Sequence, residues 1–395
     1  MAAWPGRPDA GTAAPAEPPG AGACGYPRDD PGPEGGGYPR EDPGPEGQRR
    51  SPPGWSAGVT AAPWAPGAAT GVGSMPGEDM DAAVRLVLGE LSVPYLPELP
   101  ARGLGADLVG RGVAHLAELH ADVQPSGWRL VDRPGRDEAR ARDLLEADLD
   151  VLAVAGADWN GPFKVQVAGP WTLAAALELP RGHRVLSDAG AVRDLTDALA
   201  EGTVRLLTAV SRRLPAARLI CQVDEPGLPG VLAGRIPTPS GWGRVRVVAE
   251  PDAEAGLARV LAACSVVPAV PAVHCCADDA PLRLFRSAGA TAVSLDLTRF
   301  TDEDALGEFV DGGGWLIAGT VPALGPGVAP AVRELADPLR RLWRRLGFAP
   351  ETLAERVAVS PTCGLAGASP GWVRTALDLC RRSAQLLAEA PESAR

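Results

Sequence analysis

The chain has 395 residues, of which 45% are hydrophobic, and it carries a formal net charge of −11. That length and apolar content suffice for one large globular domain or for two ordinary ones. The acidic balance argues against nucleic acid as a ligand, because phosphate backbones are bound by clustered basic residues.

The first 67 residues are predicted to form a disordered, low-complexity tail. Pro, Gly and Ala dominate this stretch, and the segment 25–35 returns almost unchanged as 37–47. Such a composition buries too little apolar surface to offset the entropy of ordering the chain. The functional alternative is a tethered binding arm of polyproline II character, but we favour a dispensable tail. Trp64 is assigned to this tail, and residues 68–395 are assigned to a single folded domain.

From about residue 68, short β-branched runs alternate with longer stretches of helical period. Eight strands are predicted, at Thr70–Ser74, Ala121–Gln124, Lys164–Ala168, Leu219–Val223, Ala269–His274, Ala292–Leu297, Trp315–Thr320 and Val357–Ser360. The clearest helices are Asp81–Leu91, Arg136–Ala155, Val192–Arg213 and Trp372–Ala388.

This alternation is typical of parallel βαβ units, so the predicted fold class is α/β. Eight such units in about 320 residues fit a (β/α)8 TIM barrel. The alternative is a doubly wound open sheet. Against that alternative, no Gly-x-Gly-x-x-Gly turn follows the first predicted strand.

Small and polar residues gather where the predicted strands end. They are Gly73–Pro76, Ser126–Trp128, Gly169–Thr172, Asp224–Pro226, His274–Cys276, Asp296 and Cys363–Leu365. The carboxyl ends of barrel strands lie on one face, where the active sites of such barrels assemble. We therefore expect these distant segments to converge on one site.

Cysteine usage and the apolar runs indicate the compartment. Seven cysteines, an odd number in a long chain, are not typical of a secreted disulfide framework. No apolar run reaches the roughly 18–20 residues that span a bilayer, and the N-terminus does not have the pattern of a signal peptide. We therefore expect a cytoplasmic protein with no membrane partner.

The clearest metal-binding pattern is His274-Cys275-Cys276, at the end of the fifth predicted strand. Strand residues alternate between faces, so His274 and Cys276 should point the same way and Cys275 should point away. Zinc prefers tetrahedral N and S ligands, and Cys363 is the best candidate for a third ligand. Asp296 is a candidate carboxylate ligand. The alternative is that these residues belong to the core, because cysteine is among the most buried residue types.

Taken together, four motifs resemble the cobalamin-independent methionine synthase family, specifically its C-terminal catalytic barrel. In chain order they are Val72-Gly73-Ser74, Asp224-Glu225-Pro226, His274-x-Cys276 and Cys363-Gly364-Leu365. The resemblance covers about residues 70–385. The wider superfamily, which is similar in its strand-end motifs, includes uroporphyrinogen decarboxylases and corrinoid-linked methyltransferases.

The resemblance implies a zinc-dependent methyltransferase that moves a methyl group to the thiol of homocysteine and forms methionine. His274, Cys276 and Cys363 match the zinc ligands of the family. Asp296 stands where the family carries a glutamate ligand, and it is one methylene shorter. Coordination to zinc keeps a thiol deprotonated at neutral pH, which makes it the nucleophile in methyl transfer.

The resemblance also implies how the amino-acid substrate is held. Asp224 matches the catalytic carboxylate that binds the amino group of homocysteine, and Glu225 beside it is counted as substrate-binding. The residues Val72, Gly73 and Ser74 match the segment that receives the substrate's carboxylate.

Departures from the family concern the methyl donor. Thr320–Ala323 contains no histidine where the family carries a His-Ser-Pro-like segment, and Leu173–Leu177 replaces an aromatic stretch associated with the folate. The family's N-terminal duplicate barrel is not found in these residues. The donor therefore stays open between methyl-folate and methyl-corrinoid, the latter supplied free or by a corrinoid protein. Two alternative functions also stay open: a decarboxylase-like or corrinoid-linked relative, and a catalytically silent zinc- or thiol-binding protein.

Overall fold

The computed structural model describes residues 62–392, and a parallel six-stranded sheet organises them. Its strands follow one another in chain order: β3 (Pro162–Ala168), β4 (Arg218–Asp224), β5 (Ala269–Cys275), β6 (Ala292–Asp296), β7 (Trp315–Val321) and β8 (Val357–Pro361). Almost every residue in them is buried, as expected for parallel strands that are covered on both faces. Six of the predicted strands are thereby confirmed.

Two further extended segments, 68–75 and 93–98, connect the edges of this curled sheet. The amide of Thr70 donates to the Val359 carbonyl of β8 over 3.0 Å, and the amide of Val93 donates to the Ala69 carbonyl over 3.0 Å. The amide of Leu96 then donates to the Lys164 carbonyl of β3 over 3.0 Å. Hydrogen bonding thus passes from β8 through both segments to β3, an arrangement that fits a TIM-like barrel.

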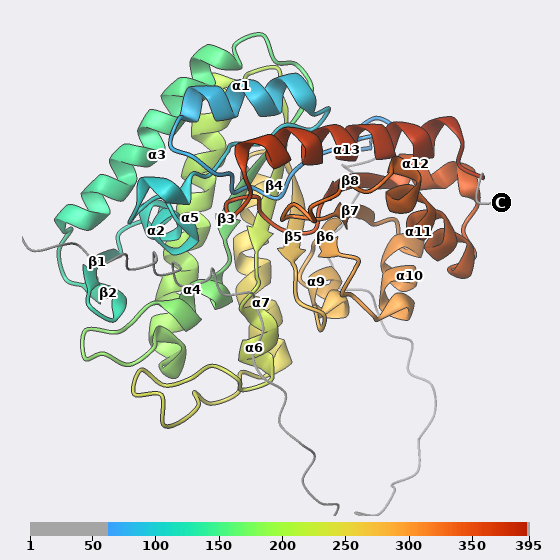
Figure 1. The fold of residues 1–395 in the computed structure, drawn as a ribbon. Coiled ribbons are helices and arrows are strands. Elements are labelled where there is room, and N and C mark those ends of the chain that lie inside the picture. The colour runs from blue at the N-terminus through green and yellow to red at the C-terminus, as the bar shows by residue number, and fades with distance from the viewer. Residues whose placement is uncertain (1–61, 393–395) are drawn as a thin grey trace, which may run out of the picture. The chain divides into compact units, whose positions relative to one another are not determined.

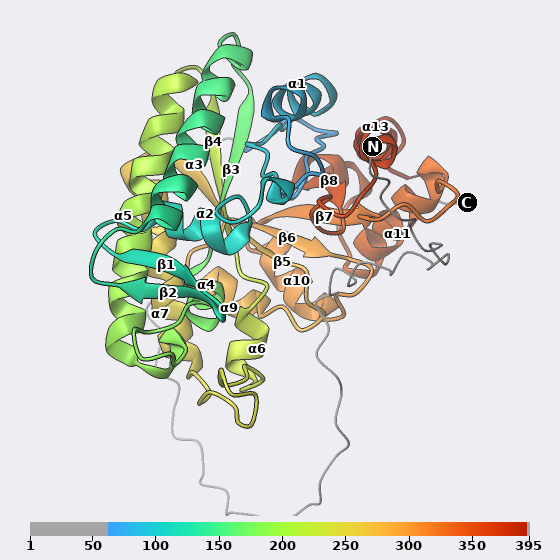
Figure 2. The ribbon, with the colours of Figure 1, turned by 60° about the vertical axis from the view of Figure 1, so that its left-hand side comes forward.

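The prediction that Ala121–Gln124 forms the second barrel strand is wrong. β1 (His120–Gln124) instead pairs antiparallel with β2 (Gly127–Val131) in a separate two-stranded sheet. Both ribbon views show this hairpin beside α3 and away from β3–β8 (Figures 1 and 2). The segment Ser126–Trp128 therefore lies in the hairpin and not at the end of a barrel strand.

Segment 93–98 lies beside β3 instead, and its prolines explain why the sequence does not indicate an extended segment there. Pro94 and Pro97 have no amide hydrogen, which normally excludes a residue from a central strand. Here the residues between and beside these two prolines donate the hydrogen bonds to the neighbouring segments. Glu98, for example, donates to the Gly73 carbonyl over 3.1 Å.

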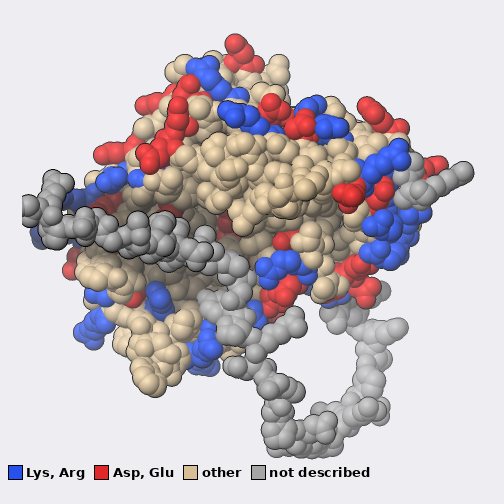
Figure 3. All heavy atoms as spheres, in the orientation of Figure 1, with Lys and Arg blue, Asp and Glu red and all other residues tan. Residues whose placement is uncertain are grey.

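Helices follow the strands and lie outside the sheet (Figure 1). They are α1 (Met80–Glu90), α2 (Leu108–His115), α3 (Arg136–Ala155), α4 (Pro170–Ala176), α5 (Ala189–Arg213), α6 (Leu228–Leu232), α7 (Glu250–Leu261), α8 (Ala263–Val266), α9 (Leu282–Ser287), α10 (Glu303–Asp311), α11 (Val332–Arg345), α12 (Leu353–Arg356) and α13 (Pro370–Glu389). The four helices expected from the sequence are among them. On the face shown in Figure 3, acidic and basic side chains are interspersed around a wide uncharged area. None of the helices within residues 62–392 has the length and apolar character needed to cross a bilayer.

Trp64 lies in the predicted tail, yet this residue is only 2% exposed. It packs in a cluster with residues near the starts of the sheet strands, among them Ile220, Ala272 and Ile317. The rest of the predicted tail that precedes residue 62 lies outside the described residues. The packed part of the chain therefore begins before residue 68.

Replacing Trp64 by alanine should lower the free energy of unfolding by about 3–5 kcal/mol, because the substitution leaves a large cavity among these side chains. Chemical denaturation would measure the loss. Trp242→Ala is the matched control, since that indole is 96% exposed and its removal should change stability by less than about 0.5 kcal/mol. Equal stability of the two variants would show that Trp64 contributes no packing.

Candidate functional site

The strand register places the predicted site residues side by side at the carboxyl edge of the sheet. Asp224 at the end of β4 is paired with His274 of β5, and His274 is paired with Ser294 of β6. Parallel strands end at a common edge, so side chains that are distant in sequence meet there. Cys363 reaches the same edge from two residues beyond β8.

Three of the predicted metal ligands lie together. One ligand atom each from His274, Cys276 and Cys363 lies within 4.8 Å of the others, and the two Sγ atoms are 3.8 Å apart. Two sulfurs bound to zinc at about 2.3 Å in a tetrahedral arrangement would also stand about 3.8 Å apart. The residues therefore fit a zinc ion. Cys275 is fully buried in the hydrophobic core, as expected from its opposite strand face.

The imidazole of His274 is oriented through its other nitrogen. Nδ1 lies 3.1 Å from the Ser294 carbonyl oxygen and 3.1 Å from the Ser294 hydroxyl. A proton on Nδ1, donated to the carbonyl, leaves Nε2 as the nitrogen for a metal. Such support of a metal-binding histidine by an acceptor on its second nitrogen is the usual arrangement.

The charges of the three residues also suit a cation. The hydrogen bond with Cys276 lowers the pKa of Cys363 to about 4, helped by His274 and opposed by burial. Burial depresses the pKa of His274, but its contact with Cys363 and the charge of Asp224 raise that pKa above its ordinary value overall. A thiolate on Cys363 is thus favoured, and its negative charge suits a metal cation at this position.

Asp296 lies near this group but is not part of the cluster of mutually close ligand atoms found in the described residues. Its Oδ1 accepts hydrogen bonds from the Thr298 amide over 2.9 Å and from the Thr298 hydroxyl over 2.6 Å. Burial raises the pKa of Asp296 despite these two bonds. One carboxylate oxygen is therefore already engaged with the protein.

Asp224 is almost fully buried, at 6% exposure. Its Oδ1 accepts a hydrogen bond of 2.7 Å from the Gln222 amide, which also donates to the Val72 carbonyl over 2.9 Å. Burial raises the pKa of Asp224 to about 7. A buried carboxylate with one neutral hydrogen-bond partner is suited to a cationic substrate group, because that group would replace the water molecules that burial removes.

The segment Val72–Ser74 offers backbone donors. All three of its carbonyls accept hydrogen bonds, from Lys164, Glu98 and Leu365 among others. Among the described residues, however, no acceptor is found for the amides of Gly73 and Ser74. The backbone of Gly364 approaches the Ser74 hydroxyl so closely that a Cβ there would lie 2.0 Å from it. Two adjacent amides and a hydroxyl together suit a carboxylate.

Glu225, expected to bind substrate, has a different place in the structure. One carboxylate oxygen accepts from the Trp171 amide over 2.9 Å. The other accepts from the amide and the hydroxyl of Thr172, over 2.9 Å and 2.7 Å. The side chain is fully buried, and it fixes the start of α4. Both of its oxygens are already bonded within the protein, so we leave it out of the substrate site.

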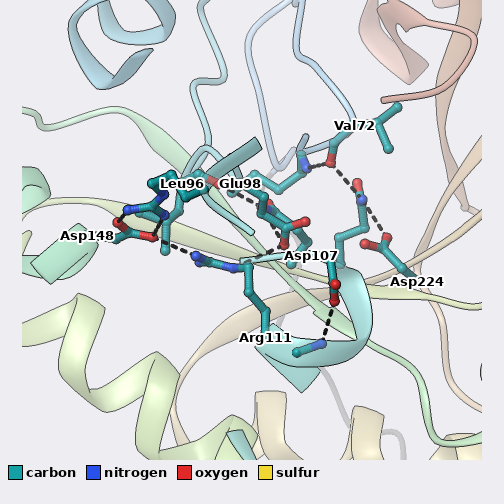
Figure 4. A network of polar contacts seen from close by, with 12 residues as sticks. Val72, Leu96, Glu98, Asp107, Arg111, Asp148 and Asp224 are labelled. Atoms are coloured by element: carbon teal, nitrogen blue, oxygen red, sulfur yellow. Dashed lines mark hydrogen bonds and ion pairs between the residues drawn. The ribbon is translucent and has the colours of Figure 1, made fainter. Parts of the chain in front are cut away.

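Glu98 is a further candidate site residue, and it escapes prediction from the sequence because segment 93–98 does not resemble a strand. It ends segment 93–98 with 5% exposure, and its Oε1 lies 3.2 Å from the Gln166 amide and 3.5 Å from Arg111 Nε. Arg111 in turn contacts Asp148 over 2.6 Å. Figure 4 shows this network continuing to Val72 and Asp224. The signal in the sequence was a lone carboxylate directly after a short apolar run.

Comparisons with known proteins identify the family and the fold. The family model described as "Cobalamin-independent synthase, Catalytic domain" matches residues 159–386. A B12-independent methionine synthase from Shewanella sp. W3-18-1, solved in complex with selenomethionine, superposes with a TM-score of 0.55 at 14% identity, covering 82% of this chain and 98% of that one. This likeness shows a shared fold.

A crystal structure of oxaloacetate acetylhydrolase is also matched, with a TM-score of 0.23 and 14% identity over 50% of this chain and 67% of that one. That likeness is too low to support an argument. The comparison with curated proteins gives no match.

Proposed function

The chain belongs to the cobalamin-independent synthase family and is a methyltransferase, and from this premise we propose that it methylates the thiol of homocysteine in a zinc-dependent reaction. The observation that carries the proposal is the cluster of His274, Cys276 and Cys363, with its sulfur separation of 3.8 Å. We further propose that the fold is a complete (β/α)8 barrel, with segments 68–75 and 93–98 as its first two strands.

In this proposal the residues at the carboxyl edge of the sheet have separate roles. His274, Cys276 and Cys363 hold zinc, and Asp296 is a candidate for a fourth, exchangeable ligand. When bound, zinc supplies the means of keeping the substrate thiol deprotonated at neutral pH. The reducing cytoplasm, where we place the protein, keeps both cysteines available as thiols.

The substrate's amino acid moiety is held by a separate set of residues. Asp224 accepts the ammonium group, and its burial strengthens that contact by excluding water. The amides of Gly73 and Ser74 donate to the carboxylate. The two charged groups on the substrate's α-carbon are thus fixed, and the sulfur at its other end is directed toward the metal ligands, which favours a reactive geometry.

The proposal is tested by metal analysis followed by turnover. We expect about one zinc per chain, and methionine formed from homocysteine with either methyl-tetrahydrofolate or methylcobalamin as donor. Zinc without turnover with either donor would favour a silent thiol-binding protein. A chain that binds no zinc would instead favour a relative of the decarboxylases, which need no metal.

A further inference from the structure

The chain contains 38 Lys and Arg residues, and only one of them, Lys164, is a lysine. At every other position that carries a permanent positive charge, the chain uses arginine. The two residues differ physically: an ammonium is a compact point charge, whereas a guanidinium is a wide planar fork. The single lysine therefore places a compact cation at a position where every other charged base of the chain would be a wider guanidinium.

Lys164 lies in β3 and is completely buried, which is rare for a lysine. Its Nζ donates a hydrogen bond of 2.7 Å to the Val72 carbonyl and lies 5.1 Å from the centre of the Tyr95 ring. That ring is itself fully buried, and a Cβ added at Gly71 would lie 2.4 Å from it. The Tyr95 ring is therefore packed tightly against Gly71 and has little freedom to move aside for a larger side chain at position 164.

The ammonium stands among acidic groups from several elements. Those whose charges act on Lys164 are Asp224 and Cys221 of β4 and Glu98 of segment 93–98. Burial lowers the pKa of Lys164 to about 8, and these three groups oppose that shift. Glu98 also lies 3.5 Å from Arg111 Nε, so both Lys164 and Arg111 act on its charge.

We propose that Lys164 is the positioning residue of the amino-acid site, and this inference rests on the proposed function. Through the Val72 carbonyl it holds the backbone of Val72–Ser74, whose amides receive the substrate's carboxylate. Its charge also offsets one of the two carboxylates, Glu98 and Asp224. The site thereby accepts a zwitterionic amino acid and not a thiol in general.

The unique lysine makes a direct test simple. Protein grown with lysine that is 13C-labelled at Cε gives one labelled side-chain signal, that of Lys164. Adding L-methionine to the metal-free full-length protein should shift this signal, whereas 2-mercaptoethanol should not. This readout depends on neither zinc nor activity.

Variants test the same inference by affinity. Lys164→Met should weaken L-methionine binding and raise the KM for homocysteine by about 10- to 100-fold, the loss that removal of a charge-assisted contact produces. Zinc content should be unchanged. Lys164→Arg should show a similar loss, because it keeps the charge but not the size. Arg212→Met, at an exposed position in the last turn of α5, is the control and should behave like the wild type.

The outcomes separate this inference from the proposed function. A wild-type protein that binds neither homocysteine nor methionine would contradict the proposed function itself. A wild-type protein that binds methionine while the Lys164 signal stays unchanged would overturn the positioning role alone. Lys164→Met binding methionine within twofold of the wild type would overturn it as well.

Discussion

Replacing Cys276 or Cys363 by serine is expected to abolish stoichiometric zinc binding. Each substitution removes one of the three ligand atoms that lie within 4.8 Å of one another. Loss of an outer partner of a zinc ligand already costs about 10- to 100-fold in affinity, and loss of a thiolate ligand should cost more. Metal analysis after dialysis against a weak chelator would measure the effect.

Cys275→Ser is the matched control, because that side chain lies in the hydrophobic core on the opposite face of β5. It should retain zinc, although a buried hydroxyl will lower stability somewhat. Asp296→Ala should lower zinc affinity less than either cysteine variant, since water or the substrate thiol takes the vacant position. Full zinc content in Cys363→Ser would rule out the proposed site.

Asp224→Asn is expected to weaken homocysteine binding by about 1.5–3 kcal/mol, or roughly 10- to 150-fold, because it removes a charged partner of the ammonium group. Zinc content should not change, since Asp224 is not in the ligand cluster. Calorimetric titration would measure both quantities. Unchanged affinity would remove Asp224 from the substrate site.

The same residue predicts a pH dependence that is best measured with L-methionine, which has no thiol to titrate. Burial raises the pKa of Asp224 to about 7, so below that pH the carboxyl gains a proton and loses its charge. Methionine affinity of the wild type should therefore fall as the pH drops through 7, by up to about tenfold per pH unit. In Asp224→Asn this dependence should be absent. A wild-type affinity that is flat between pH 8 and pH 6 would contradict the assignment.

Site residues that are close together in the sequence could be predicted from their spacing alone. His274 and Cys276 are two residues apart on one strand, so alternation alone puts both on the same face. Cys363 comes from the far end of the sheet, and the resemblance to the family, together with its place after a predicted strand, pointed to it. For Glu225, nothing local in the sequence indicates that its carboxylate bonds to the start of α4.

Errors in the fold have a common physical origin. The segments 120–124 and 127–131 alternate between apolar and polar residues, and both form strands. Whether such a strand joins the large sheet or pairs with its neighbour depends on contacts with residues that are distant in the sequence. Segment 93–98 carries two prolines and so does not resemble a strand, yet the amides of Val93, Leu96 and Glu98 find acceptors on both sides. Trp64 looked like part of the tail, because only the folded barrel provides the cluster that covers it.

The sequence by itself determined the α/β class, the order of six strands, and the facing of His274 and Cys276, because periodicity and strand alternation are local properties. The tertiary structure alone decided which extended segments join β8 to β3, the 3.8 Å approach of Cys363 to Cys276, and the surroundings of Glu98 and Lys164. Hydrogen bonds between distant strands and burial of charge depend on how distant parts of the chain pack together. Local sequence patterns do not contain that information.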